Sequence, residues 1–516
     1  DAVNYPRGDQ AQALTGALYF IRDQWRFPLF NIENIGLGFP VNVVFTDSIP
    51  LFALFFKLWY GFTGDVVNYF GFWIAVCFIF QAVAFTLTLR HFTDINIISL
   101  IACVFLAGTA PVLLFRYWLW HLALCGHFLI LFSLLLYLRL DQKDPWPTAA
   151  ICWFLLLVAS LWVHPYLFAM CFPFFIIYGL QRIRFQTDLK TVGQTVFFAI
   201  AVSVGLIGIM GVSGHITFDS VLKPNNGFGI YSMNGLAPFG AMGKSGIIAG
   251  TGHFARAIDG QIEGFNYLGV GVFAGLALAF LAALLNPRKF IAMIKKHWPL
   301  WILFLIFSIF AISNKIYIGH TLVLEYPIPG PIKDIANTFQ SSGRFFWPVC
   351  YGLMIGAVGM IMRCFSLRTA IVLLVAITAL QVWDTRVLRE VATTEKPPGV
   401  IASNATLQSF FSKHQYFAVY PPMGCISGRP MMQNFELQLL AAYYGLKTNS
   451  IAGARIHVDC RKHLNSLRHK TIIEDDTLMV LHPPFNKPAF IFSKTWQKQC
   501  FEFKNVCFCS QHKLLE

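Results

Sequence analysis

Ten apolar runs, each long enough to cross a membrane as a helix, dominate this sequence and limit it to one broad class of fold. A spanning helix needs roughly 17–25 predominantly apolar residues. The composition agrees, because 56% of the residues are hydrophobic and only 12% are charged. We therefore predict an α-helical polytopic membrane protein. The expected spans lie near residues 68–90, 94–115, 118–139, 147–163, 165–182, 194–213, 265–286, 299–314, 344–362 and 369–386.

Lysine and arginine gather in alternate loops between these runs. Cytoplasmic loops carry an excess of Lys and Arg, so the five basic loops are predicted to be cytoplasmic. The net charge of +14 then indicates orientation against anionic membrane lipids, and no nucleic-acid partner is expected. The basic residues of these loops are Arg90; Arg139 and Lys143; Arg182, Arg184 and Lys190; Arg288, Lys289, Lys295 and Lys296; Arg363 and Arg368.

This orientation places residue 1 on the extracytoplasmic side. The sequence begins with Asp and has no initiator Met, so we expect one further span before it and eleven spans in all. The apolar segment from Ile49 to Phe62 is too short and too interrupted to cross. We predict that it forms a helix lying in the membrane interface.

Three domains are expected. Residues 1–67 form an extracytoplasmic first loop with interfacial helices, 68–386 form the transmembrane domain, and 387–516 form a small extracytoplasmic α/β domain, because short apolar runs there alternate with amphipathic ones. In an oxidising compartment its cysteines predict one or two disulfides and a leftover thiol. These five cysteines are Cys425, Cys460, Cys500, Cys507 and Cys509.

Two carboxylates of the first loop are candidates for chemistry. Asp9 and Asp47 stand just before apolar helical runs, Ala11 to Phe20 and Ile49 to Tyr60. At a helix N-terminus a carboxylate can cap free backbone N–H groups, so plain capping is the alternative to a catalytic role.

Further ionisable residues fall at the extracytoplasmic ends of the spans. Charges at the hydrocarbon edge are costly, so their gathering on one membrane face indicates an aqueous or functional cavity. Each has a structural alternative: a histidine before proline can end a helix, basic side chains can extend to the interface, and a carboxylate can stabilise a first helical turn. His127, deeper in its helix, is expected to pack against neighbours. The residues at the edge are Arg116, His121, His164, Glu263, Lys333, Asp334 and Arg344.

Arg344 has the most specific surroundings. It follows Ser341-Ser342-Gly343 at an expected helix N-terminus. That pattern combines a guanidinium fork with free backbone N–H groups, which is a phosphate-binding arrangement. We therefore predict that Arg344 binds a phosphate, with Asp9 facing the same cavity and His164 and Glu263 on its wall.

The order of these features resembles the GT-C superfamily of membrane glycosyltransferases, and specifically an uncharacterised bacterial branch. The resemblance covers roughly residues 5–460. Its motifs are specific only as a set: Gly8-Asp9, Tyr19-Phe20-Ile21-Arg22, Thr46-Asp47-Ser48-Ile49-Pro50-Leu51, Gly126-His127, Val163-His164-Pro165-Tyr166, Glu263-Gly264-Phe265-Asn266-Tyr267-Leu268-Gly269 and Ser342-Gly343-Arg344-Phe345-Phe346-Trp347-Pro348.

The resemblance implies transfer of a sugar from a polyprenyl-phosphate donor to a lipid or glycan acceptor on the outer face of a bacterial inner membrane. Asp9 would then be the catalytic base. Many such enzymes have paired acids here, and no acid adjoins Asp9, so Asp47 is the candidate second carboxylate. The donor phosphate would be bound by a group of five residues, namely Arg344, Arg116, His121, His164 and Glu263. Whether a divalent cation takes part is left open.

A transporter or non-catalytic subunit that handles a lipid-linked substrate is the alternative, since discontinuous helices and intramembrane charge serve it equally. No inverted repeat is visible in the sequence, which weighs against a transporter. The sugar, the acceptor and the oligomeric state do not follow from these residues.

The loop charges predict that the C-terminal domain is extracytoplasmic. A reporter that works only in the cytoplasm, fused after Glu516, should be silent, and an export-dependent reporter at the same site should be active. The opposite pattern in whole cells would overturn the orientation.

Overall fold

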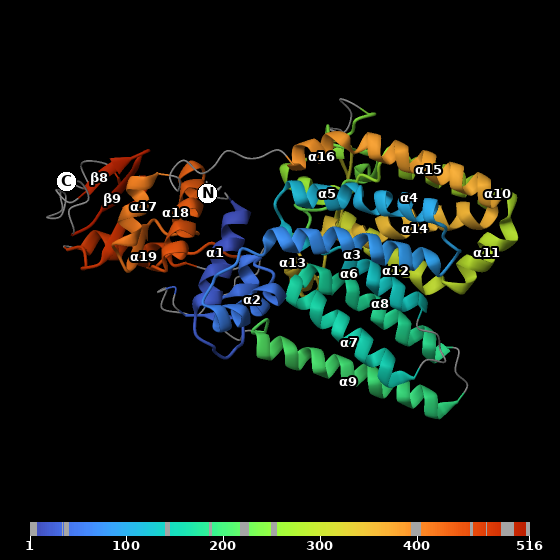
Figure 1. The fold of residues 1–516 in the computed structure, drawn as a ribbon, viewed down its shortest axis with the longest axis horizontal. Coiled ribbons are helices and arrows are strands. Elements are labelled where there is room, and N and C mark those ends of the chain that lie inside the picture. Colours follow the sequence, from blue (N-terminus) through green and yellow to red (C-terminus); the bar gives the residue numbers. More distant parts are fainter. Residues whose placement is uncertain are drawn as a thin grey trace. The chain divides into compact units, whose positions relative to one another are not determined.

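The computed structural model describes residues 8–33, 35, 41–139, 145–184, 188–216, 227–248, 255–393, 404–454, 458–470, 472–483, 485–486 and 500–511 (Figure 1). The chain divides into two compact units. The first combines residues 1–69, 209–223 and 395–516, and the second combines 70–208 and 224–394.

The second unit is built from apolar helices, which confirms the predicted helical class. Each of the ten predicted runs contains at least one helix. They are α3 (Phe70–Arg90), α4 (Ile97–Gly108) with α5 (Pro111–Trp118), α6 (Phe128–Arg139), α7 (Trp146–Val163), α8 (Pro165–Arg184), α9 (Leu189–Ser213), α10 (Val270–Leu285), α12 (Trp298–Ile312), α14 (Trp347–Cys364) and α15 (Leu367–Asp384).

By length and composition, fewer of these helices can span a membrane than the ten that are predicted from the sequence. Seven helices among the described residues are long and apolar enough to cross a membrane, or up to nine if each of two bent pairs is one span. The difference from ten is α12, which has only 15 residues.

Prolines mark the breaks between helices. The α4–α5 pair bends by 43° before Pro111, and α10 turns by 107° into α11 (Pro287–Lys296). The residue before a proline is disfavoured in the helical region, so each preceding helix stops there. The predicted break at His164 is confirmed, since α7 ends at Val163, His164 is extended and α8 begins at Pro165.

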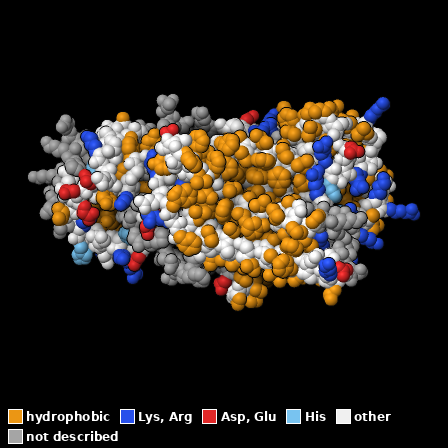
Figure 2. Space-filling view, turned by 60° about the horizontal axis from the view of Figure 1, so that its bottom comes forward, with side chains coloured by type: hydrophobic (Ala, Val, Ile, Leu, Met, Phe, Trp, Pro, Cys, Tyr) orange, Lys and Arg blue, Asp and Glu red, His pale blue; other side chains and the backbone are white. Residues whose placement is uncertain are grey.

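The outer surface of these helices is apolar. Figure 2 shows hydrophobic side chains continuous over one face, and the most apolar 18-residue stretch of α9 is only 17% buried. A soluble monomer rarely exposes so large an apolar patch. The second unit therefore suits a lipid environment.

A buried carboxylate joins the loop before α10 to the end of α15. Asp384 accepts hydrogen bonds from the hydroxyls of Ser245 and Tyr267 and from the backbone N–H of Val270, the last two at 2.9 Å. Three donors satisfy a charge that would otherwise be costly to bury. The remaining elements of this unit are η2 (Leu122–Cys125), η3 (Ala237–Phe239), η5 (Asp259–Gly264), β3 (Lys315–Ile318), β4 (Thr321–Glu325), α13 (Gly330–Thr338), η6 (Ser342–Phe346) and α16 (Arg386–Thr393).

The first unit contains a small α/β sheet region, as the sequence predicts. Its five strands have the order β6-β5-β7-β9-β8, with β5 parallel to both neighbours and β9 antiparallel to β7 and β8. The strands are β5 (Tyr416–Tyr420), β6 (Lys447–Thr448), β7 (Thr477–Leu481), β8 (Cys500–Phe503) and β9 (Val506–Cys509), and the helices beside them are α17 (Ala405–Ser412), α18 (Arg429–Tyr444) and α19 (Cys460–His469).

The N-terminal segment packs on this region. The hydroxyl of Tyr19, on α1 (Asp9–Arg22), donates to the carbonyl of Leu446 at 2.6 Å. Arg22 donates to the carbonyls of Ala442 and Tyr443 at 2.6 and 2.8 Å. These carbonyls end α18, where a cation is favourable. Residues 1–67 and 387–516, which are expected from the sequence to be separate domains, thus share one unit.

Three short elements and one apolar helix complete the first unit. The elements β1 (Asn31–Ile32), β2 (Val41–Asn42) and η1 (Val43–Thr46) precede α2 (Pro50–Thr63). This 14-residue helix coincides with the expected interfacial segment. It exposes an apolar stripe of Phe55, Leu58, Trp59 and Phe62, which suits a membrane interface. Its position in an interface stays a prediction.

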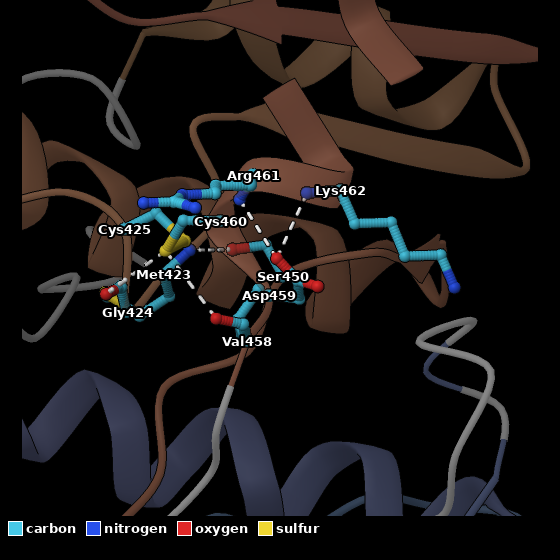
Figure 3. The surroundings of a disulfide bond; sticks show 9 residues. All are labelled: Met423, Gly424, Cys425, Ser450, Val458, Asp459, Cys460, Arg461 and Lys462. Carbon is cyan, nitrogen blue, oxygen red and sulfur yellow. Dashed lines mark hydrogen bonds between the residues drawn. A yellow bond between two sulfur atoms is a disulfide. The ribbon is translucent and has the colours of Figure 1, made fainter. Parts of the chain in front are cut away.

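Two disulfides cross-link the C-terminal region, which confirms the prediction of one or two disulfides there. Cys425 pairs with Cys460 and Cys500 with Cys509, and Cys507 keeps its thiol. Figure 3 shows the first disulfide beside the turn in which the Asp459 side chain accepts from the N–H groups of Arg461 and Lys462, both at 3.1 Å. Burial raises the pKa of Cys507 to about 11, so its thiol is unreactive at neutral pH.

Thiol mapping should find a single free cysteine in this region. In the denatured, unreduced protein, iodoacetamide should label Cys507 and leave the four disulfide-bonded cysteines unmodified, as read by peptide mass spectrometry. Prior reduction should expose all five, which is the control. Labelling of Cys425 or Cys509 without reduction would contradict the pairing.

Candidate functional site

Two arginines from distant segments meet on one carboxylate in the helical unit. Arg116, on α5, approaches Oε2 of Glu263 at 2.6 Å and also donates to its backbone carbonyl at 2.9 Å. Arg344, in η6, donates to the same Oε2 through Nε at 3.0 Å and through Nη2 at 2.8 Å. Glu263 lies in η5. The structure therefore brings together three of the predicted residues.

Two glycines allow these segments to meet. A Cβ added to Gly343 would lie 2.6 Å from Cα of Gly264, and one added to Gly264 would lie 2.4 Å from the carbonyl oxygen of Ser232. Asn266 then donates to the carbonyls of Gly264 and Gly343 at 3.0 and 2.9 Å. The residues beside Glu263 and Arg344 thus form one close backbone contact, which only glycine permits.

His121 extends the cluster. Nη1 of Arg116 donates to Nδ1 of His121 at 3.3 Å. A guanidinium can only donate, so Nδ1 is the acceptor and the proton of the neutral ring is on Nε2. The same Nδ1 is 3.9 Å from Oε1 of Glu263.

Aromatic rings cover both guanidinium groups. Arg344 lies over the ring of Tyr166 at 4.7 Å, and Arg116 over Trp347 at 5.3 Å. Tyr166 also links His164 to the cluster, because its N–H donates to Nδ1 of His164 at 3.1 Å and its hydroxyl accepts from the N–H of Ser341 at 2.8 Å. All five predicted donor-site residues thus belong to one connected group.

Electrostatics keep the shared carboxylate ionised. Burial alone would raise the pKa of Glu263, but the charges of Arg344 and Arg116 lower it below its ordinary value of 4.5. The side chain of Arg116 is 0% exposed, whereas those of Arg344 and Glu263 are 11% and 14% exposed. Two guanidinium groups and one carboxylate leave this trio with a net positive charge, and only Arg344 and Glu263 are partly exposed to solvent.

Two interpretations of these residues need correction. Arg116 does not extend to an interface, because it is fully buried. The turn before Arg344 also offers fewer free N–H groups than predicted. The N–H of Gly343 donates to Tyr231, that of Arg344 donates to Ser341, and that of Ser341 donates to Tyr166. Any phosphate bound here would depend on the guanidinium groups.

The carboxylates of the first loop belong to the other unit. Asp9 is the exposed first residue of α1, whose N-cap is Gly8, and Asp47 follows η1 with φ of 57°. The N-cap of α2 is Ile49. Neither aspartate is therefore the N-cap residue of the helix that follows it. That Asp9 and Arg344 face one cavity stays a prediction.

Sequence reasoning missed Tyr166 and Trp347 as parts of the site. Both stand inside motifs that were singled out, Val163-His164-Pro165-Tyr166 and the run ending Trp347-Pro348. An aromatic residue next to a buried cation is a common partner. In a sequence so rich in aromatic residues, that signal is weak. His127 packs as expected, against Trp347 at 4.3 Å, and is hydrogen-bonded to Tyr351 at 2.7 Å.

One group of metal-type ligands occurs among the described residues. The sulfur atoms of Cys500, Cys507 and Cys509 lie within 4.8 Å of one another, but Cys500 and Cys509 are joined as a disulfide. Within the described ranges no carboxylate belongs to a group of this kind.

A family model described as "Domain of unknown function (DUF6311)" matches residues 3–386. The match covers the first loop and the helical unit and ends before the C-terminal sheet region. No curated protein and no solved structure matches the chain.

Removal of the shared carboxylate should destabilise the protein. Glu263→Gln leaves buried Arg116 without its counter-ion, which should lower the free energy of unfolding by about 3–5 kcal/mol in a denaturant titration in detergent. Because folding depresses the pKa of Glu263, its stabilisation is present above pH 4.5 and is lost as the pH falls through the folded-state value.

Glu325→Gln is the matched control. Glu325 belongs to the same unit and forms an ion pair with Lys315 at 2.9 Å, but its side chain is 48% exposed. The expected change in the free energy of unfolding is therefore below about 1 kcal/mol. Equal effects of the two substitutions would show that the Glu263 cluster is not a stabilising centre.

Proposed function

The chain belongs to the DUF6311 family, whose function is unknown, and from that premise we propose that it is an integral-membrane glycosyltransferase. It would transfer a sugar from a polyprenyl-phosphate donor to a lipid or glycan acceptor on the extracytoplasmic face of a bacterial inner membrane. The proposal is supported by the resemblance to GT-C enzymes and by the geometry of the Glu263 cluster.

The observation that carries the proposal is the convergence of Arg116 and Arg344 on one carboxylate oxygen. Guanidinium groups bind phosphate oxygens through a planar fork of donors. A departing lipid phosphate gains negative charge as its bond to the sugar breaks, and fixed cations stabilise that charge most strongly where water is scarce. Arg344, the more exposed of the two, would contact the phosphate, and buried Arg116 with Glu263 would hold it in place.

An apolar groove leads toward this cluster. It has a volume of about 550 Å³ and lies between α8 and α12, where its lining includes Phe172 and Leu180 from α8 and Ile302 and Phe307 from α12. The ring of Phe307 is 6.2 Å from that of Phe345, the residue after Arg344. A prenyl chain in this groove would place its phosphate toward Arg344. The hydrophobic lining would stabilise the chain by excluding water.

Asp9 is assigned the role of general base. In the proposed reaction the acceptor hydroxyl oxygen attacks the anomeric carbon, and the bond from that carbon to the phosphate oxygen breaks. The hydroxyl proton passes to the Asp9 carboxylate, and the polyprenyl phosphate leaves with the bonding electrons. An exposed carboxylate near the reacting centre can perform this transfer. Asp47 would orient the acceptor beside it.

Transport of a lipid-linked substrate without chemistry is the second candidate. The bent pairs α4–α5 and α10–α11 favour it, since discontinuous helices are common in transporters. The two candidates differ in their need for a base at Asp9.

Asp9→Asn should abolish transfer while leaving the protein folded. In cells that lack the gene, we expect the polyprenyl-phosphate-linked sugar to accumulate, and complementation with the wild-type chain to remove it. The variant should turn over about 10²–10⁴-fold more slowly, because the amide keeps the size of the side chain but cannot accept the proton. Mass spectrometry of the lipid extract measures the donor.

Asp65→Asn is the control, as an exposed aspartate of the same N-terminal segment. It should complement fully. If Asp9→Asn also complements fully at equal expression, the base assignment is wrong and transport is favoured.

A further inference from the structure

A second cavity lies at the other end of the helical unit. It has a volume of about 380 Å³ and is enclosed by α6, α11, α12 and α14 together with the turn after α3. The helix α14 links the two regions, because Arg344 lies in η6, directly before this helix, and Arg363 is near its end. Its 18 residues span about 27 Å. The cavity is therefore separate from the Glu263 cluster.

Basic side chains surround the mouth of this cavity. Lys289 and Lys296 come from α11 and Arg363 from α14, and none of the described lining residues is Asp or Glu. Figure 2 shows lysine and arginine side chains gathered at the end of the unit where Figure 1 places α11. An anion would be attracted to this mouth, since opposite charges are weakly screened at a partly buried site.

A buried histidine lines the same cavity without its full set of partners. His297 is 8% exposed, and its Nδ1 has no hydrogen-bond partner among the described residues. Burial, and then the charges of Lys296 and His91, lower its pKa to about 4, so the ring is neutral at pH 7. A buried polar atom without a partner is costly, and a ligand oxygen or hydroxyl can satisfy it.

The floor of the cavity is apolar and is kept open by glycine. Leu134, Leu300 and Ile355 line it. On α14, a Cβ at Gly356 would meet no atom within 4 Å, and one at Gly359 would meet only Phe92, at 4.0 Å. These glycines leave room along the helix that a larger side chain would fill. The combination of a polar mouth and an apolar floor matches an amphiphile.

We propose that this cavity binds a lipid with an anionic phosphate headgroup. The phosphate lies between Lys289, Lys296 and Arg363, His297 donates to or accepts from the headgroup, and an acyl or prenyl chain lies along Gly356 and Gly359. Basic pockets between membrane helices are suited to such headgroups. The site is independent of the proposed glycosyl transfer, since it shares no residue with the Glu263 cluster or with the α8–α12 groove, although α12 contributes residues to both cavities.

Native mass spectrometry of the purified full chain in detergent tests the site. Phosphatidylglycerol should bind as a retained adduct, and phosphatidylcholine with the same chains should bind at least tenfold more weakly, because its headgroup has no net charge. Lys289→Gln with Lys296→Gln should weaken phosphatidylglycerol binding by roughly ten- to thirtyfold. Gly356→Leu should weaken it through the floor, without a change of charge.

Matched variants make the result decisive. Arg288→Gln with Lys295→Gln removes the same charge from the same helix at positions that do not line the cavity, and Gly208→Leu places a leucine in open space on α9. Both should bind phosphatidylglycerol as the wild type does. Equal losses in the control and cavity variants, or equal binding of the two lipids, would overturn the proposal. Displacement of phosphatidylglycerol by inorganic phosphate at the same concentration as the lipid would also overturn it, because the site would then bind a free anion.

Discussion

The shared carboxylate of Glu263 sets the geometry of one end of the helical unit. A guanidinium as deeply buried as that of Arg116 costs several kcal/mol unless a counter-ion meets it with good geometry. Glu263 meets it from 147 residues away and binds Arg344 from 81 residues away. Because Arg116 is near the end of α5 and Arg344 lies in η6, directly before α14, one ion cluster fixes both helices relative to the loop before α10. Any ligand at this end must adapt to that fixed arrangement.

Much of the helical fold could be predicted, because long apolar helices leave a strong pattern in the sequence. The break at His164 was readable from Pro165, which cannot extend a preceding helix. The angles between the helices could not be predicted. Pro111 and Pro287 both end a preceding helix, yet the α4–α5 pair bends by 43° and the α10–α11 pair by 107°. What differs is the packing around each break, which depends on segments far away in the sequence. The joining of α1 to α18 was hidden for the same reason.

The candidate site was predictable as a set of residues but not as a set of contacts. Arg116, His121, Glu263 and Arg344 stood out because charge at the edge of an apolar run is expensive. The residues next to each of them in the sequence do not indicate which side chain it contacts. The N–H groups before Arg344 illustrate this limit, since the Ser-Ser-Gly pattern indicates free donors while Tyr231 and Tyr166 occupy them. Gly264 and Gly343 are the one sequence signal for this contact, because glycines beside two opposite charges permit a close approach of their backbones.

The contact between α1 and α18 has a consequence for the order of synthesis. Arg22 and Tyr19 bind carbonyl groups that follow them by 420 and 427 residues. At about 5–20 residues per second, roughly 20–80 s separate the emergence of α1 from that of its partner. During this interval Tyr19 and Arg22 lack the acceptors that later fix them, while the whole helical unit is being made. The end of α18, made after the whole helical unit, therefore completes the packing of the first helix in this sequence.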